Sequence, residues 1–165
     1  MTRRTSFTFS PEGMAQINAI RQRVHAADAG DVIRTSLTAY DDLVSLAARG
    51  YQMFIRDAEG AKWPYSPYVK LSYPGLKREE INAEAEAAAK TTKAETFFFS
   101  GDIITKIESL KKRSHLSSQV MTVRVALSAF KELVLVLEAG DTFYLRDADG
   151  VETPYNPFQP VAIAA

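Results

Sequence analysis

One sequence unit occurs twice in the chain, and this repeat constrains the fold more than any other feature. Residues 5–68 align without a gap on residues 95–158, an offset of 90 positions, and 19 of the 64 aligned positions carry the same residue. The segments TSFTFSPEG, LTAYDDLV and IRDAEG of the first copy correspond to ETFFFSGDI, LSAFKELV and LRDADG of the second. Because both copies should adopt the same elements and can pack against each other, the repeat sets the architecture.

Each copy is predicted to begin with a strand that leads into a helix. Polar and aromatic residues alternate over residues 6–9, and this period of two is typical of a short strand. The sequence Ser10-Pro11-Glu12 then provides a side-chain cap, a proline at the first helical position and an acidic first turn. Together these residues predict that a helix starts at this point.

A second helix and a hairpin are predicted to follow in each copy. Ala29-Gly30 breaks the helical pattern in the first copy, and Ser117-Ser118 can cap the later helix in the second. Beyond Gly50 and Gly140, apolar strand residues run into turn residues, which predicts small β-hairpins. The apolar helix faces comprise Met14, Ile17, Ile20, Val24, Ile33, Leu37, Tyr40 and Val44 in the first copy and Ile104, Ile107, Leu110, Val123, Leu127, Phe130 and Val134 in the second.

A polar segment separates the copies. Residues 69–94 contain the run LKREEINAEAEAAAK, which is rich in helix-forming residues and poor in large apolar ones. This composition predicts a partly helical, solvated linker between a first repeat at 1–68 and a second repeat at 95–165. The predicted fold class is mainly α with short β strands.

The first strands of the two copies are predicted to pair with each other. A lone strand leaves its ladder groups unpaired and two short helices bury little surface, so each copy needs a partner strand and partner helices. Residues 6–10 and 96–100 can supply an antiparallel two-stranded ribbon within one chain. The linker is long enough for this pairing, and it equally permits exchange of halves between two molecules.

Composition excludes several classes of function. The chain has no cysteine, so disulfides, cysteine-based metal sites and thiol catalysis are excluded, and the cytoplasm is the predicted compartment. Lys and Arg balance Asp and Glu at 20 each, so a nucleic-acid partner would have to be held by a local patch. No apolar run of about 18 residues occurs, which argues against secretion and against a membrane partner.

Catalytic and metal signatures are missing from the sequence. It contains no phosphate-binding loop, serine-nucleophile motif or zinc-protease motif, so the chain is not expected to be an enzyme. His25 and His115 occupy equivalent positions at the ends of the first helices, where the helix dipole favours an imidazolium without any ligand. We therefore predict no metal and no cofactor.

The order strand, helix, longer helix resembles the ribbon-helix-helix family of Arc and MetJ type. The segments that carry the resemblance are Thr5 to Pro11, Asp31 to Tyr40, Glu95 to Gly101 and Met121 to Phe130. Neither the hairpins nor the linker belongs to it. The resemblance implies two ribbon-helix-helix-like repeats that share one antiparallel ribbon, which lies in the DNA major groove, while the start of each second helix holds a phosphate.

The resemblance also implies two groups of DNA-binding residues. Those facing outward from the ribbon, toward base edges, are Ser6, Thr8, Ser10, Thr96, Phe98 and Ser100. Those placed near phosphates are Arg3, Arg4, Lys90, Lys93, Arg34, Arg124, Ser117 and Ser118. Asp28 and Asp31 would repel a phosphate at the first copy, so the second copy is the better anchor. For both arginines of the second helices, a carboxylate partner is an open alternative to DNA.

Two features of the family are missing here. The family usually places a long Arg, Lys, Asn or Gln in the outward set and one more residue before the helix proline. The resemblance nevertheless implies sequence-specific binding of double-stranded DNA, by a transcriptional regulator such as a repressor or by an accessory factor in plasmid or phage DNA processing. The alternative is a non-enzymatic protein-interaction or structural module with the same fold and no DNA contact. A homo-oligomer or a protein partner is compatible with either function.

Overall fold

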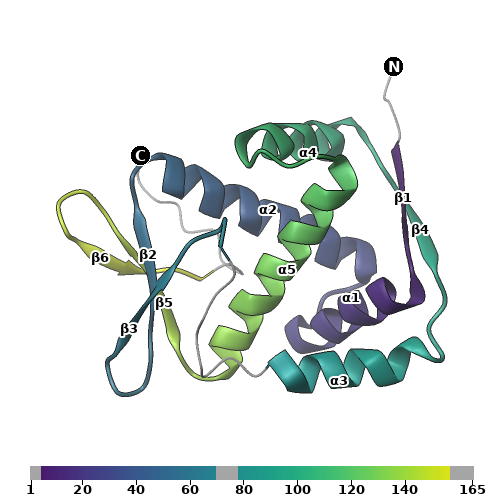
Figure 1. Ribbon diagram of the computed structural model, residues 1–165, viewed down its shortest axis with the longest axis horizontal. Coiled ribbons are helices and arrows are strands. Elements are labelled where there is room, and N and C mark those ends of the chain that lie inside the picture. The colour runs from purple at the N-terminus through teal and green to yellow at the C-terminus, as the bar shows by residue number, and fades with distance from the viewer. Residues whose placement is uncertain (1–4, 70–77, 157–165) are drawn as a thin grey trace.

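The computed structural model describes residues 5–69 and 78–156. Arg3, Arg4 and the outer ends of the predicted repeats lie outside these residues. The described elements are β1 (Thr5–Phe9), α1 (Pro11–Val24), α2 (Ala29–Ala48), β2 (Gln52–Arg56), β3 (Lys62–Tyr65), α3 (Arg78–Ala89), β4 (Glu95–Phe99), α4 (Gly101–Arg113), α5 (Gln119–Glu138), β5 (Thr142–Arg146) and β6 (Glu152–Pro154). Figure 1 shows the helices between a two-stranded ribbon at one end and a four-stranded sheet at the other. The architecture is mixed, with more helix than strand.

The predicted pairing of the first strands is confirmed. Strands β1 and β4 form an antiparallel ribbon in which Phe7 pairs with Phe97. These two phenylalanines also stand 90 positions apart in the sequence, so the repeat relates the two strands by an approximate two-fold axis through this pair. The ribbon is therefore built within one chain from both copies.

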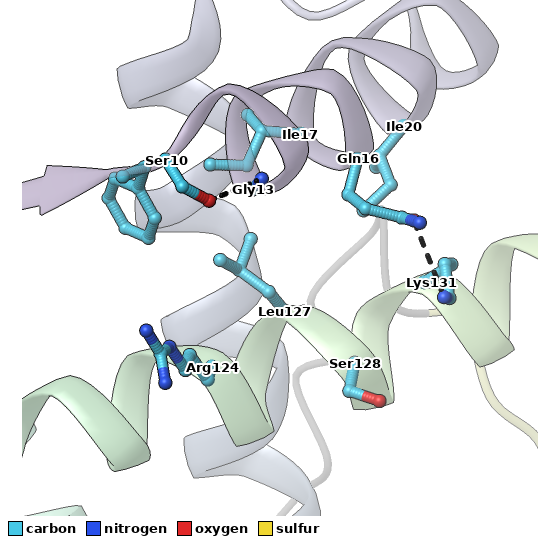
Figure 2. Close-up of a pocket in the computed structure, with 10 residues that line it drawn as sticks. Ser10, Gly13, Gln16, Ile17, Ile20, Arg124, Leu127, Ser128 and Lys131 are labelled. Atoms are coloured by element: carbon cyan, nitrogen blue, oxygen red, sulfur yellow. Dashed lines mark hydrogen bonds between the residues drawn. The ribbon is translucent and has the colours of Figure 1, made fainter. Parts of the chain in front are cut away.

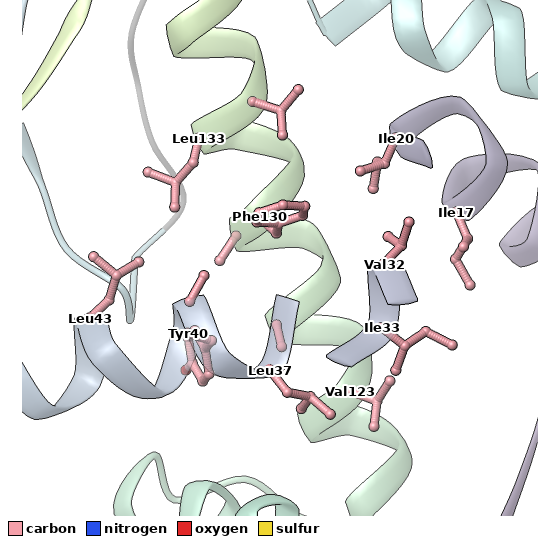
Figure 3. Packing of buried hydrophobic residues seen from close by; sticks show 14 of the residues in the cluster. Ile17, Ile20, Val32, Ile33, Leu37, Tyr40, Leu43, Val123, Phe130 and Leu133 are labelled. Carbon is pink, nitrogen blue, oxygen red and sulfur yellow. The ribbon is translucent and has the colours of Figure 1, made fainter. Parts of the chain in front are cut away.

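The core lies where α2 crosses α5. Tyr40 and Leu37 of α2 meet Phe130 of α5, and all three are at most 2% exposed. Figure 3 shows Ile17 and Ile20 of α1 reaching the same cluster. The predicted apolar faces thus point inward, and each second helix packs on the second helix of the other copy. Burial of this many aliphatic and aromatic side chains is the main source of stability.

The two hairpins, predicted as separate units, form a single sheet. Its strand order is β3-β2-β5-β6, because β2 and β5 pair across the copies. Phe54 and Tyr144, again 90 positions apart, pair at the centre of this contact. Both sheets therefore need both copies, and the approximate two-fold axis passes through both. Inward-facing Met53 and Phe143 extend the helical core onto this sheet.

Charged side chains cover the outer face of the four-stranded sheet. The rings of Phe54 and Tyr144 stack with centroids 5.4 Å apart, and the Arg56 guanidinium lies 4.7 Å from the Tyr144 centroid. Above them, Lys62 of one edge strand forms an ion pair of 2.8 Å with Glu152 of the other edge strand. This pair links the two outer strands across the middle of the sheet.

Two details of the predicted organisation differ in the structure. The helix predicted within the linker is present as α3, but it is not fully solvated, because it packs on α1 and buries Ile81 completely and Ala85 almost completely. Ile81 and Ala85 are four residues apart and form only a narrow apolar stripe on the helix. The overall composition of the segment gives no sign of this stripe. Ala29 and Gly30 do not break the helical pattern, because α2 starts with them. Asp28 caps α2 by accepting a hydrogen bond from the backbone N–H of Asp31 at 2.8 Å.

The break between the helices of each copy instead centres on a histidine. His25 and His115 both have left-handed backbone conformations, with φ of 56° and 55°. The backbone N–H of His25 donates to the carbonyl of Arg21 and closes the last turn of α1. The equivalent histidines therefore shape equivalent turns, and both side chains are exposed.

Candidate nucleic-acid interface

The ribbon has an aromatic inner face and a polar outer face. Phe7 and Phe99 pack against each other beneath it, with ring centroids 5.8 Å apart, and both are nearly fully buried. Every member of the predicted outward set is exposed: Ser6, Thr8, Ser10, Thr96, Phe98 and Ser100. Alternation along the strands thus brings these residues to one solvent-facing surface, which we call the ribbon surface.

Cross-strand pairing divides the ribbon surface into two unlike ends. Thr8 pairs with Thr96, and their hydroxyl oxygens are 2.8 Å apart, within hydrogen-bond distance. Ser6 pairs with Phe98, whose ring is 66% exposed. The approximate two-fold axis exchanges these two pairs, so a hydroxyl pair occupies one end of the ribbon and a hydroxyl beside a phenyl ring occupies the other.

The serines that close the ribbon are engaged differently. The Ser10 hydroxyl caps α1 by accepting a hydrogen bond from the Gly13 backbone N–H at 3.1 Å. Ser100, at the equivalent place before α4, makes no such side-chain cap. Its hydroxyl is therefore the freer of the two to reach a ligand.

The starts of α2 and α5 carry different charge. At α2, Asp28 is the cap and Asp31 lies in the first turn, so two carboxylates stand where a phosphate would bind. At α5, Ser118 caps the helix by accepting from the Met121 backbone N–H at 3.0 Å, Ser117 precedes it, and the first turn holds no acid. The first turn of α5 thus carries less negative charge than that of α2, although the Glu108 carboxylate of α4 accepts a hydrogen bond from the side chain of Gln119 at the start of α5.

Arg34 and Arg124 project from equivalent turns of these helices, and both are exposed. The Arg34 guanidinium lies 5.9 Å from the Phe99 ring centroid, so it sits at the base of the ribbon. A Cβ placed on Gly30 would lie 3.4 Å from a guanidinium nitrogen of Arg34 and 3.3 Å from a carboxylate oxygen of Asp28. The Arg34 guanidinium therefore lies near the Asp28 carboxylate, whose negative charge partly offsets it.

Basic residues also flank the second strand. Lys90 directly follows α3 and Lys93 lies two residues before β4, and both are exposed. Arg3 and Arg4, predicted to do the same for β1, lie outside the described residues. The carboxylate of Glu95, at the start of β4, is also exposed, and its negative charge partly offsets the positive charge of the lysines. Glu95 was not among the site residues predicted from the sequence.

The ribbon surface is thus polar, narrow and flanked by a modest positive charge. No protein-family model, no curated protein and no solved structure matches this chain. No helix among the described residues is long and apolar enough to cross a lipid bilayer.

Proposed function

We propose that the protein binds double-stranded DNA by placing the ribbon surface in the major groove. The observation that carries this proposal is the antiparallel ribbon of β1 and β4, raised on two equivalent strand-helix-helix units with its hydroxyls outward. The B-DNA major groove, about 12 Å wide, admits a two-stranded ribbon whose strands lie about 5 Å apart. This arrangement resembles that of ribbon-helix-helix proteins, and no cofactor takes part in it.

In this proposal the flanking residues hold phosphates. Lys90 and Lys93 lie on the β4 side of the ribbon, and Arg3 and Arg4 precede β1 in the sequence. Phosphate contacts of this kind position a protein on DNA but do not read its sequence. Ser118, with the free amides at the start of α5, supplies a further phosphate contact.

Sequence is read by the two ends of the ribbon. The exposed ring of Phe98 suits the methyl group of thymine, while the hydroxyls of Thr8 and Thr96 suit hydrogen-bonding base edges. Because these ends differ, we expect the preferred site to be an imperfect palindrome. A protein bound to such a site near a promoter would act as a repressor, and one bound near an origin would act as an accessory factor.

The first test is fluorescence anisotropy on a duplex selected from a random library, repeated across salt concentrations. Binding through several phosphates should weaken with a log–log slope of about −0.9 per phosphate neutralised. Phe98→Ala and Thr8→Ala should each lose about 1–3 kcal/mol of discrimination at a different half of the site. Lys93→Ala should instead weaken binding to all duplexes and reduce the salt slope by about 1.

No binding to any selected duplex at low salt would refute the proposal. If the Phe98→Ala and Thr8→Ala changes had equal and negligible effects, the ribbon would not be part of the DNA interface.

One observation favours the alternative, a protein-interaction module. The hydroxyls of Thr8 and Thr96 form a hydrogen bond with each other, and beside Ser6 the ribbon surface presents the exposed phenyl ring of Phe98. In that case the unchanged protein would bind no duplex, and the Phe98→Ala change would abolish its binding to a protein partner.

A further inference from the structure

A cavity of about 300 Å3 lies between α1 and α5, at the base of the ribbon. Its apolar wall consists of Phe9, Ile17, Ile20 and Leu127. Figure 2 shows Leu127 of α5 pointing toward α1, between Ser10 at one end and Gln16 at the other. A hollow of this volume matches the lower range of small-molecule sites, which are mostly apolar with a few placed polar groups.

Two cations stand at opposite ends of the cavity. Arg124 and Lys131 are seven residues apart on α5, so two helical turns, about 10 Å, separate their backbones on one face of the helix. The residues that line the cavity include these two cations and no carboxylate. At the Arg124 end, the Ser10 hydroxyl accepts from the Gly13 backbone N–H and keeps its own proton to donate to an anion, while Glu12 in the first turn offsets the dipole of α1.

Interactions cross the equivalent groove, which lies between α4 of the second copy and α2 of the first. Arg113 of α4 forms an ion pair with Asp41 of α2, and Lys106 donates to the Thr38 hydroxyl at 3.2 Å. Arg34, the equivalent of Arg124, lies over the Phe99 ring. These contacts use the charged groups of that groove within the protein itself.

In the groove between α1 and α5, two substitutions change this pattern. Lys131 occupies the position of Asp41, and Gln16 occupies that of Lys106. Arg23, the equivalent of Arg113, pairs instead with Glu84 of α3 at 3.0 Å and with Glu138 at the end of α5 at 3.2 Å. Lys131 donates to the side-chain oxygens of Gln16 at 3.4 Å and Asn82 at 3.1 Å, so no carboxylate lines the cavity beside Arg124.

We propose that this cavity binds a small amphipathic carboxylic acid. Its carboxylate lies between the Arg124 guanidinium and the Ser10 hydroxyl, and its apolar body, about 10 Å long, runs along Ile17, Ile20 and Leu127 toward Gln16. Such a ligand contacts Phe9, the last residue of β1, and the cap of α1 at the same time. The ligand site does not depend on DNA binding, and it places a regulatory molecule directly beneath the ribbon.

The test uses sodium octanoate as the probe and the full-length protein without DNA. Titration followed by backbone amide NMR and by calorimetry should give saturable binding at one site, with the largest shifts in Gly13, Gln16 and Ser128. The Arg124→Gln change should weaken octanoate binding by about ten- to a hundredfold, as expected for loss of a charge-assisted hydrogen bond. The uncharged probe 1-octanol should bind more weakly than octanoate by a similar factor.

The matched control is Arg34→Gln, which alters the equivalent arginine of the other groove and should leave octanoate affinity unchanged. Absence of saturable binding, or equal losses in the Arg124 and Arg34 variants, would overturn the proposal. Equal affinity for octanol and octanoate would do so as well, because it would show that the acid is not recognised. Since no DNA is present, a negative result here is separate from any failure of the DNA-binding proposal.

Discussion

Adjacent residues of β4 provide the sharpest test of the ribbon, because Phe98 and Phe99 have the same side chain on opposite faces. Phe99 is 2% exposed and packs on Phe7 and under Arg34, whereas Phe98 is 66% exposed. Truncation of a buried phenylalanine to alanine costs about 3–5 kcal/mol, because the cavity left behind collapses only partly. Truncation of an exposed side chain changes stability by about 0.5 kcal/mol or less.

The assay is urea unfolding of the two alanine variants, monitored by circular dichroism. With a denaturant dependence of about 2 kcal/mol/M, Phe99→Ala should lower the unfolding midpoint by about 1.5–2.5 M, and Phe98→Ala should leave it nearly unchanged. Phe99→Leu, which leaves a smaller cavity, keeps the comparison measurable if the alanine variant is too unstable. Equal losses, or a larger loss for Phe98→Ala, would refute the register, since a slip of one residue exchanges the two faces.

Two further predictions concern the contact between the copies. Hydrogen bonds from Lys62, and then from Arg146, hold the pKa of Glu152 below its usual value of 4.5. The ionised carboxylate therefore stabilises the fold above that pH. This contribution is lost as the pH falls through the pKa of the folded state. Urea unfolding should therefore show Glu152→Gln to be destabilised at about pH 7 and to approach the unchanged protein at about pH 3; a constant difference would contradict this sign. The fragment 1–70 lacks β4 and β5, so light scattering should find it unfolded, aggregated or self-paired, and a folded monomer would disprove the pairing of the copies.

Much of the fold follows from local signals in the repeat. The start of α1 at Pro11 and the cap of α5 at Ser118 were predicted, because capping chemistry acts within a few residues. The break at Ala29-Gly30 was misplaced, because α1 already ends at the left-handed His25 and the side chain of Asp28 caps the start of α2, which leaves Ala29 and Gly30 inside that helix. The joining of two hairpins into one sheet depends on contacts 90 residues apart, and no local pattern specifies them.

The candidate site was predictable to a similar extent. Alternation placed Ser6 and Phe98 on the outer face, as observed. Cross-strand partners were not predictable, because they depend on the register between distant segments, and the hydroxyl contact of Thr8 with Thr96 follows from that register. The cavity beside α5 was missed, although the change from Asp41 to Lys131 between aligned copies is visible in the sequence.

The ion pair of Lys62 with Glu152 has a consequence for the evolution of such a chain. The two residues hold equivalent positions in the repeat, so a symmetric dimer of identical halves would place two lysines or two glutamates there. Joining the halves in one polypeptide removes that restriction, because each position can then change without its counterpart. It also makes assembly of the two halves independent of protein concentration, whereas separate chains would dissociate on dilution. Covalent linkage thus allows the two halves to diverge in charge, as Lys62 and Glu152 have done.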